Sequence, residues 1–241
     1  MTEQEWITCA EPTKMLEFVR EKVSKRKWSL FMCGGCRYIA HLFFDPKSQM
    51  AVEVRERYAD GQAGQDEMDR AAYYAESPTF GYHFEPTFWT SYPDEDRASL
   101  HRLVEMGALS SSALSGGEWR VNEAVRDKLL AAAHLAEGYC HLILESIPKV
   151  DWPGPSLCRC VFGNPFRPPS PLPPTVLAWN DSTVRRMAQG IYDDRSFDRL
   201  PILSDALLDA GCDDEELIGH CRSEGPHVRG CWAVDRILGK E

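Results

Sequence analysis

Apolar residues recur at helical spacing along most of the chain, and caps and stops divide this pattern into segments. Thr2 and Glu5 have the spacing of a capping box, which predicts a helix start. Pro12 is placed to open the next helix, with Leu16 and Val19 on one face. The same spacing predicts further helices over residues 27–44, 46–60, 66–76, 94–106 and 118–147.

The C-terminal part of the chain has shorter helical segments with clear start and end signals. Their predicted starts are Asp181 or Ser182, Pro201, a capping box of Asp213 and Glu216, and a position near Val228. Gly211 and Gly239 are predicted to end two of these helices. No segment has the alternation of a strand, so the sequence predicts an all-α fold.

Two stretches interrupt the helical pattern. Residues 77–93 hold three prolines and six aromatic side chains without periodicity, which predicts an irregular loop packed on the helices. Residues 148–174 contain nine of the chain's 16 prolines, a composition typical of a linker or an extended arm. We therefore expect an N-terminal helical bundle over 1–147, an arm over 148–174 and a short-helix domain over 175–241.

The arm carries apolar residues that predict how it is held. Val161, Phe162 and Phe166 are available to anchor it on the body of the protein, and Asn164-Pro165 favours a turn between them. We expect the arm to pack rather than to extend into solvent.

Composition narrows the classes of partner. Hydrophobic residues make up 43% of the chain and charged residues 27%, which is typical of a globular protein. The formal net charge of -10 argues against a nucleic-acid partner or an anionic membrane surface, because both require clustered cations. The first twenty residues lack the apolar core of a signal peptide, and no apolar run reaches about 18 residues, so we expect a cytoplasmic protein.

The chain has nine cysteines, an odd number that favours reduced thiols over a disulfide framework. Cys33 and Cys36 form a CxxC motif that would suit thiol exchange or half a zinc site, but the expected context is helical on both sides. Cys158 and Cys160 in the arm are a possible second half of such a site. Burial of these thiols as small apolar side chains is the favoured interpretation.

A second group of metal-ligand types lies near the C-terminus. The candidate zinc ligands are Cys212, Cys221, His227 and Cys231, a set that leaves out the neighbouring His220. Their spacing is not that of a familiar zinc finger, and Cys221 and Cys231 fall on apolar helix faces. We therefore expect no cofactor, with structural zinc at this cluster as the alternative.

One helix face offers another possible metal site. His134, Glu137 and His141 share a face of the predicted helix 118–147, as inward ligands of helical bundles do. A solvated polar face is the competing interpretation of the same spacing.

The C-terminal segment also holds candidates for interaction. Arg222, Arg229 and Arg236 have the charge to bind an acidic peptide or a phosphate, or to pair with nearby aspartates. Trp232 lies in the last predicted helix, which we expect to be a packing helix first. Gly230 before it would let another part of the backbone approach closely.

Three stretches resemble a known family. They read FGNPFRP (162–168), IYDDRSFDRLPILSDALLDAGC (191–212) and HCRSEGPHVRGCWAVDRILGKE (220–241). They are similar to a large paralogous family of planctomycete proteins. Residues 1 to about 75 also resemble the N-terminal half that often accompanies this module. The C-terminal module, counted from 162 to 241, and residues 1 to about 75 together cover roughly two thirds of the chain. The resemblance implies a recurrent C-terminal module and no particular activity, cofactor or catalytic residue.

Catalytic motifs are missing from the sequence. No nucleophile elbow, phosphate-binding loop or dinucleotide fingerprint occurs. The sequence therefore predicts a non-catalytic helical module that binds another protein. The alternative is a metal-binding protein, and a third possibility is a metal-free enzyme with residues 77–93 as a lid.

Overall fold

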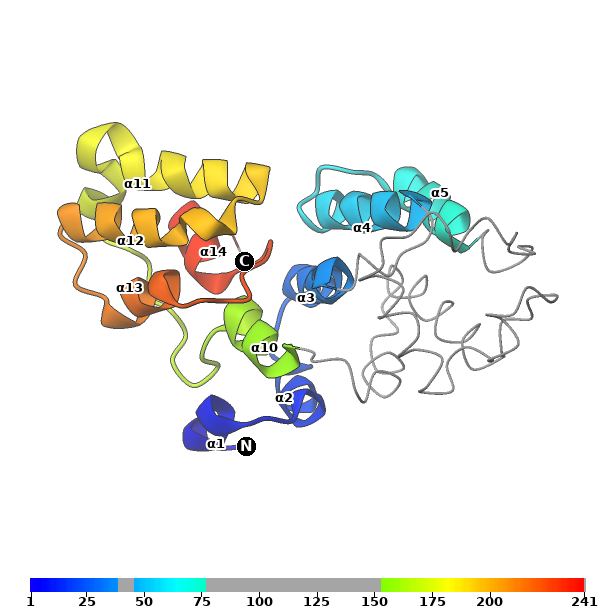
Figure 1. Cartoon of the computed structure of the whole chain (residues 1–241), viewed down its shortest axis with the longest axis horizontal. Coiled ribbons are helices and arrows are strands. Elements are labelled where there is room, and N and C mark those ends of the chain that lie inside the picture. Colours follow the sequence, from blue (N-terminus) through cyan, green and yellow to red (C-terminus); the bar gives the residue numbers. More distant parts are fainter. Residues whose placement is uncertain (39–45, 77–152, 241) are drawn as a thin grey trace, which may run out of the picture. The chain divides into compact units, whose positions relative to one another are not determined.

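The computed structural model describes residues 1–38, 46–76 and 153–240 (Figure 1). Within these ranges every regular element is a helix and no strand occurs, which confirms the all-α prediction. None of the helices in these ranges has both the length and the apolar character needed to cross a bilayer. The expected loop over 77–93 and the expected helices over 94–106 and 118–147 lie outside the described residues.

The chain forms two compact units, and one of them is discontinuous in sequence. The first unit combines Met1–Gly34 with Asp151–Glu241, and the second comprises Gly35–Val150. This division differs from the segments expected from the sequence, because the first 34 residues belong with the C-terminal part. The cause is a set of long-range contacts that helix periodicity does not reveal.

The first two helices begin where the sequence predicts, and the third begins two residues before the predicted start at Lys27. α1 (Glu3–Thr8) starts with the capping box of Thr2 and Glu5, and α2 (Pro12–Val19) opens at its proline. α3 runs over Lys25–Tyr38. Trp6 is buried, and its indole Nε1 donates a hydrogen bond of 3.0 Å to the carbonyl of Gly163.

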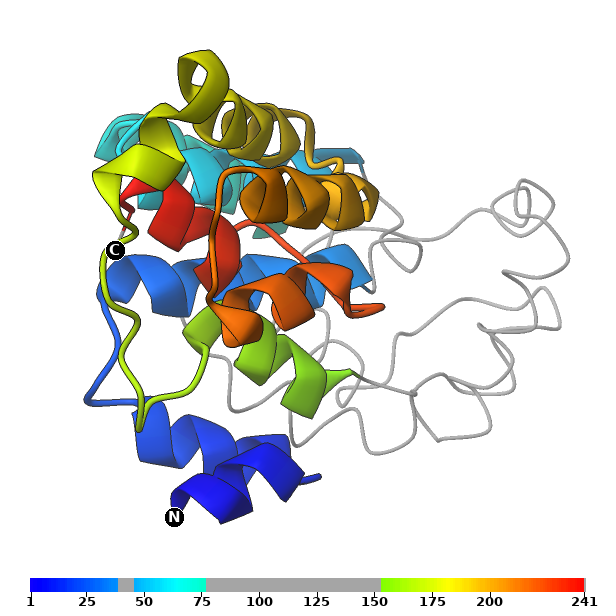
Figure 2. The same cartoon turned by 90° about the vertical axis from the view of Figure 1, so that its left-hand side faces the viewer.

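The proline-rich segment contains a helix that the sequence did not predict. α10 spans Gly154–Phe162, and its prolines lie at or before the first turn, where a missing N–H costs nothing. Leu157, Cys160 and Val161 are buried on its inner face. α10 packs on α2 and α14, and Figure 2 shows it between the N-terminal helices and α13 and α14.

Aromatic contacts hold this segment against the N-terminal helices, as expected. Phe162 stacks on Phe31 with ring centres 5.2 Å apart, and Val161 is buried. Phe166 is 38% exposed but stacks on Phe18 at 5.1 Å. The side-chain Oδ1 of Asn164 accepts from the backbone N–H of Phe166, which forms the predicted turn.

The remaining helices enclose the main hydrophobic core of the first unit. They are α11 (Pro174–Asp194), the short 3-10 helix η5 (Phe197–Arg199), α12 (Leu200–Asp209), α13 (Glu215–Arg222) and α14 (Trp232–Leu238). α11 and α12 both pack against neighbours in this group, α11 on α14 and α12 on α13. Val184, Ile191, Leu203 and Leu217 are among the buried residues.

Several predicted helix boundaries in this group are wrong by a few residues. The cap of α13 is Asp214, which accepts from the backbone N–H of Leu217, and not Asp213. α14 begins at Trp232 rather than near Val228, because residues before it form the turn that carries a candidate site. In contrast, the helix start predicted at Asp181 or Ser182 agrees with a break in α11, where Asn180, Asp181 and Ser182 have left-handed conformations.

The described part of the second unit contains a helical pair. α4 (Pro46–Ala59) and α5 (Gln65–Glu76) confirm the helices predicted there and pack on one another. Ala51, Val54 and Met68 contribute to their shared core. Arg37 makes two hydrogen bonds of 3.0 Å to the carboxylate of Glu56, which is buried.

Candidate metal centre

Two cysteines and two histidines of the first unit converge on one point. The potential ligand atoms of Cys160, His220, His227 and Cys231 all lie within 4.8 Å of one another. Cys160 comes from α10, His220 from α13, and Cys231 is the residue that caps α14. His227 lies in the turn between α13 and α14. The cluster therefore joins three helices and one loop.

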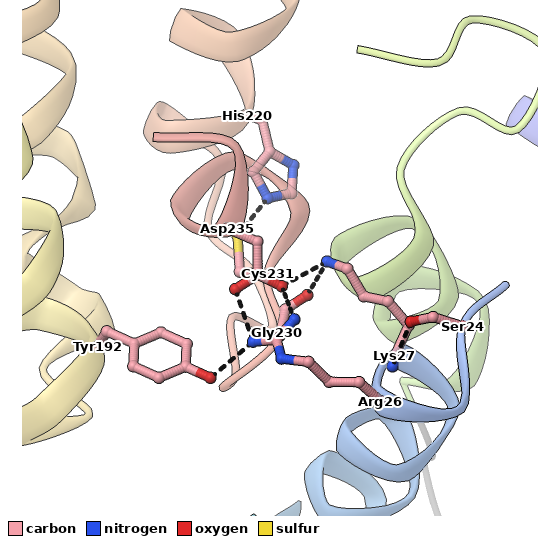
Figure 3. Close-up of polar contacts among 8 residues, drawn as sticks. All are labelled: Ser24, Arg26, Lys27, Tyr192, His220, Gly230, Cys231 and Asp235. Carbon is pink, nitrogen blue, oxygen red and sulfur yellow. Dashed lines mark hydrogen bonds and ion pairs between the residues drawn. The ribbon is translucent and has the colours of Figure 1, made fainter. Parts of the chain in front are cut away.

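The distances suit a tetrahedral metal ion. His220 Nε2 is 3.2 Å from Cys231 Sγ (Figure 3), and Cys160 Sγ is 3.7 Å from His227 Nδ1. Ligands of a tetrahedral zinc ion lie about 3.3–3.8 Å apart, for metal–ligand bonds of about 2.0–2.3 Å. Only small side-chain adjustments are needed to place four ligand atoms around such an ion.

A backbone carbonyl orients one of the histidines toward the centre. His227 Nε2 lies 3.0 Å from the carbonyl oxygen of Ser223, so this nitrogen carries the proton and donates. In the neutral ring the other nitrogen, Nδ1, is unprotonated, and it faces Cys160. Histidines that bind metals commonly have their second nitrogen fixed in this way, which sets the tautomer and the ring orientation.

Two glycines shape the turn that carries these ligands. Gly225 has a φ of +90°, and a Cβ there would lie 2.9 Å from the backbone nitrogen of His227. Gly230, also at +90°, would place a Cβ 2.8 Å from the Cβ of Leu30 on α3. The close approach at Gly230 is therefore made by the side chain of Leu30 and not, as predicted, by another part of the backbone. Gly230 lies directly before Cys231.

The local electrostatics favour one thiolate. Burial raises the pKa of the Cys231 thiol, but hydrogen bonds with Cys160, His220 and His227 outweigh it and lower this pKa well below its ordinary value. Burial and the hydrogen bond to Cys231 raise the pKa of Cys160 well above its ordinary value. For His227, burial lowers the pKa, but contacts with Cys231 and Ser223 raise it overall. Since a thiolate is the form that binds metals, Cys231 is prepared as a ligand.

Polar contacts tie the Cys231 turn to α3. Lys27 donates a hydrogen bond of 2.7 Å from Nζ to the carbonyl of Gly230 and forms an ion pair of 2.7 Å with Asp235 (Figure 3). Arg26 reaches both oxygens of the same carboxylate, at 2.7 and 3.0 Å. The N-terminal segment thus supports the backbone from which Cys231 and α14 begin.

The structure brings together half of the predicted zinc ligands. His227 and Cys231 are in the cluster, whereas Cys212 and Cys221 are buried in the hydrophobic core and are not part of it. Burial raises the pKa of Cys221 to about 12, which keeps it a neutral thiol. His220, which the sequence-based set left out, and Cys160 take the two remaining positions.

The CxxC motif lies inside a helix. Cys33 and Cys36 are both buried within α3, as the packing interpretation expects. Burial raises the pKa of Cys36 to about 12, so it lacks the thiolate character of a redox cysteine. The possible bundle site of His134, Glu137 and His141 lies outside the described residues.

The three candidate arginines have different environments. Arg222 is exposed and pairs with Asp205 at 2.8 Å. Arg236 forms an ion pair of 2.6 Å with Asp214 and donates to the carbonyl of Ser170. Arg229 has no carboxylate partner among the described residues, and its guanidinium carbon lies 4.7 Å from the centre of the Tyr192 ring.

Comparisons with known proteins give no family for the chain. No family model matches it, and neither a curated protein nor a solved structure shows significant similarity. The resemblance to a planctomycete family therefore stays a prediction.

Proposed function

We propose that the unit built from residues 1–34 and 151–241 is a zinc-binding unit in which Cys160, His220, His227 and Cys231 hold one structural ion. The convergence of four ligand atoms within 4.8 Å carries this proposal. This convergence supports the alternative of structural zinc more than the expectation that the chain has no cofactor.

The chemistry of the ligand set favours zinc. Two sulfur and two nitrogen ligands in a tetrahedral arrangement are typical of structural zinc sites. Magnesium and calcium prefer oxygen ligands, and no carboxylate belongs to this cluster of described residues. Asp235 is nearby, but its two oxygens are engaged by Arg26 and Lys27.

The arrangement suits a structural ion better than a catalytic one. Catalytic zinc normally has three protein ligands and a position for water or substrate, whereas this cluster offers four. Cys160 and Cys231 are buried, which keeps solvent from half of the coordination sphere. A closed site of this kind contributes free energy of folding rather than reactivity.

The ion would stabilise the unit by closing a long loop. Cys160 and His227 are 67 positions apart in sequence, and the cluster would fix α10 to the turn before α14. Cross-links that close long loops remove much conformational entropy from the unfolded chain. Metal binding would therefore order the same segments that the N-terminal helices pack against.

We further propose that the chain acts as a non-catalytic module for binding another protein. A zinc ion with four protein ligands has no free position at which to activate a substrate. Exposed apolar side chains would be available for contact with a partner. Ile202 and Leu208 on α12 are two of them, in the same unit as the cluster.

Cobalt substitution tests whether the site is structural and closed. We expect Co²⁺ to bind with the strong visible absorption of a tetrahedral centre and the charge-transfer band of cobalt–thiolate bonds. Added azide or imidazole should leave this spectrum unchanged, because no coordination position is open. Cys221→Ala, a control that removes a buried thiol outside the cluster, should give the same spectrum, and Cys160→Ala should not. A weak octahedral spectrum, or a spectrum that shifts with azide, would contradict the proposal.

A further inference from the structure

Arg229 is a buried cation with no carboxylate partner among the described residues. Its side chain is only 7% exposed, and its Nε has no hydrogen-bond acceptor among the described residues. The guanidinium lies over the ring of Tyr192, with 4.7 Å between its carbon and the ring centre. Such a contact compensates only part of the cost of removing a guanidinium from water.

The one buried carboxylate among the described residues of the first unit is already engaged elsewhere. Asp235 is 1% exposed and accepts from both terminal nitrogens of Arg26 and from Lys27 (Figure 3). Arg26 also donates to the hydroxyl of Tyr192 at 2.8 Å, as the same view shows. Asp235 therefore neutralises the cations of α3, and Arg229 is not among its ion-pair partners.

A second cation lies at the ring of Tyr192. Lys240 contributes a further cation, since its Nζ lies 4.4 Å from the centre of the same ring. The side chains of Arg229 and Lys240 therefore both face this ring. In folded proteins an unsatisfied buried charge of this kind often marks the position of a bound ion.

We infer that a small oxyanion of the phosphate class binds at the guanidinium of Arg229, beside Tyr192 and Lys240. A guanidinium presents a planar fork of N–H donors that matches the oxygens of phosphate. Stacking on Tyr192 fixes the plane of this fork before the anion arrives. Because Nε is enclosed, the anion reaches the terminal nitrogens. None of these residues belongs to the metal cluster, so the inference stands without the zinc proposal.

Inorganic phosphate is the probe for a first experiment on the full chain. Thermal unfolding and isothermal titration calorimetry are followed as phosphate replaces chloride at constant ionic strength. We expect saturable binding, and a rise in Tm of about 5 °C once phosphate exceeds its Kd tenfold. Sulfate should compete with phosphate if the site recognises a tetrahedral oxyanion. Heat and Tm that do not respond to phosphate, or respond without saturation, would overturn the inference.

Variants separate a binding role of Arg229 from a structural one. Arg229→Met retains length and packing on Tyr192 but removes the charge. We expect this variant to lose the phosphate-dependent rise in Tm and, without phosphate, to melt no lower than the parent. Arg229→Lys should bind phosphate at least tenfold more weakly, because it retains the charge without the fork.

Arg222→Met is the matched control, because Arg222 is exposed and pairs with Asp205 in the same unit. It should retain the full response to phosphate. An undiminished response in Arg229→Met, or an equal loss in Arg222→Met, would show that the effect does not come from the Arg229 site. If Arg229→Met fails to fold, tenfold weaker binding by Arg229→Lys still supports the inference, and unchanged binding contradicts it. The zinc content of each variant is measured alongside, so that a change in the metal centre is recognised.

Discussion

At the scale of single residues, the candidate centre depends on a few positions with little freedom to vary. Gly230 combines a φ of +90° with a Cβ position only 2.8 Å from Leu30, and it directly precedes Cys231. Ser223 supplies the carbonyl that sets the tautomer of His227. These contacts involve the backbone. They therefore cannot be inferred from the identity of the ligand residues alone.

Gly230→Ala should destabilise the first unit by at least about 2 kcal/mol. A non-glycine residue at this φ is strained, and the added methyl group would collide with Leu30 on α3. The free energy of unfolding from denaturant titration measures the effect.

Gly190→Ala is the matched control for this substitution. Gly190 lies in α11, and a Cβ there has no atom within 4 Å. This change should be neutral or stabilise the unit by up to about 1 kcal/mol, because alanine favours helix. Equal stability of Gly230→Ala and the parent would contradict the role given to Gly230.

At the scale of elements, α14 carries the packing that the sequence predicted for the last helix. Trp232 is largely buried, its ring lies 5.1 Å from that of His220, and Gly163 after α10 faces it closely. Asp235 on the same helix binds α3. The helix therefore connects the hydrophobic core, the candidate centre and the N-terminal segment.

Trp232→Ala should destabilise the first unit by about 3–5 kcal/mol, the usual cost of truncating a large core aromatic. The measurement is the free energy of unfolding of the zinc-loaded protein. Leu208→Ala on α12 serves as the control, because Leu208 is 45% exposed and should cost less than about 1 kcal/mol. A Trp232→Ala variant as stable as Leu208→Ala would show that α14 is held chiefly by its charged contacts.

The sequence predicted most helix starts in the described ranges but only part of the candidate site. Thr2, Pro12 and Pro46 mark helix starts through local chemistry, which a sequence displays directly. The prolines of residues 148–174 suggested an extended arm, although prolines in a first turn are compatible with a helix such as α10. An extended arm would place Cys160 away from the C-terminal cluster. Its contact with His227 spans 67 positions, and such pairings follow from packing rather than from spacing.

At the scale of the whole molecule, the first unit is interrupted by a long insertion. Residues 35–150 form the second unit, between the two segments that make the first. The chain leaves the first unit at Gly34, and Leu157 of the returning segment lies close to that glycine, with 3.2 Å between its Cδ1 and a Cβ built on Gly34. A short connection is therefore enough to join the two segments.

A chain in which residues 35–150 are replaced by a short Gly/Ser linker should fold and bind one zinc ion. All four cluster residues and the hydrophobic core around α14 lie in the retained segments. Circular dichroism and metal analysis would show a helical protein whose thermal unfolding depends on zinc. An unfolded product that does not bind zinc would show that the first unit requires the insertion.

The zinc content of the purified full chain tests the central claim most directly. We predict one zinc ion per chain by elemental analysis, lost in Cys160→Ser and Cys231→Ser and retained in the control variants Cys212→Ala and Cys221→Ala. Removal of the ion with a chelator should lower the Tm, because its binding energy contributes to folding. A parent protein without zinc even after exposure to the ion, or loss of zinc from the control variants instead of the cluster variants, would contradict the account.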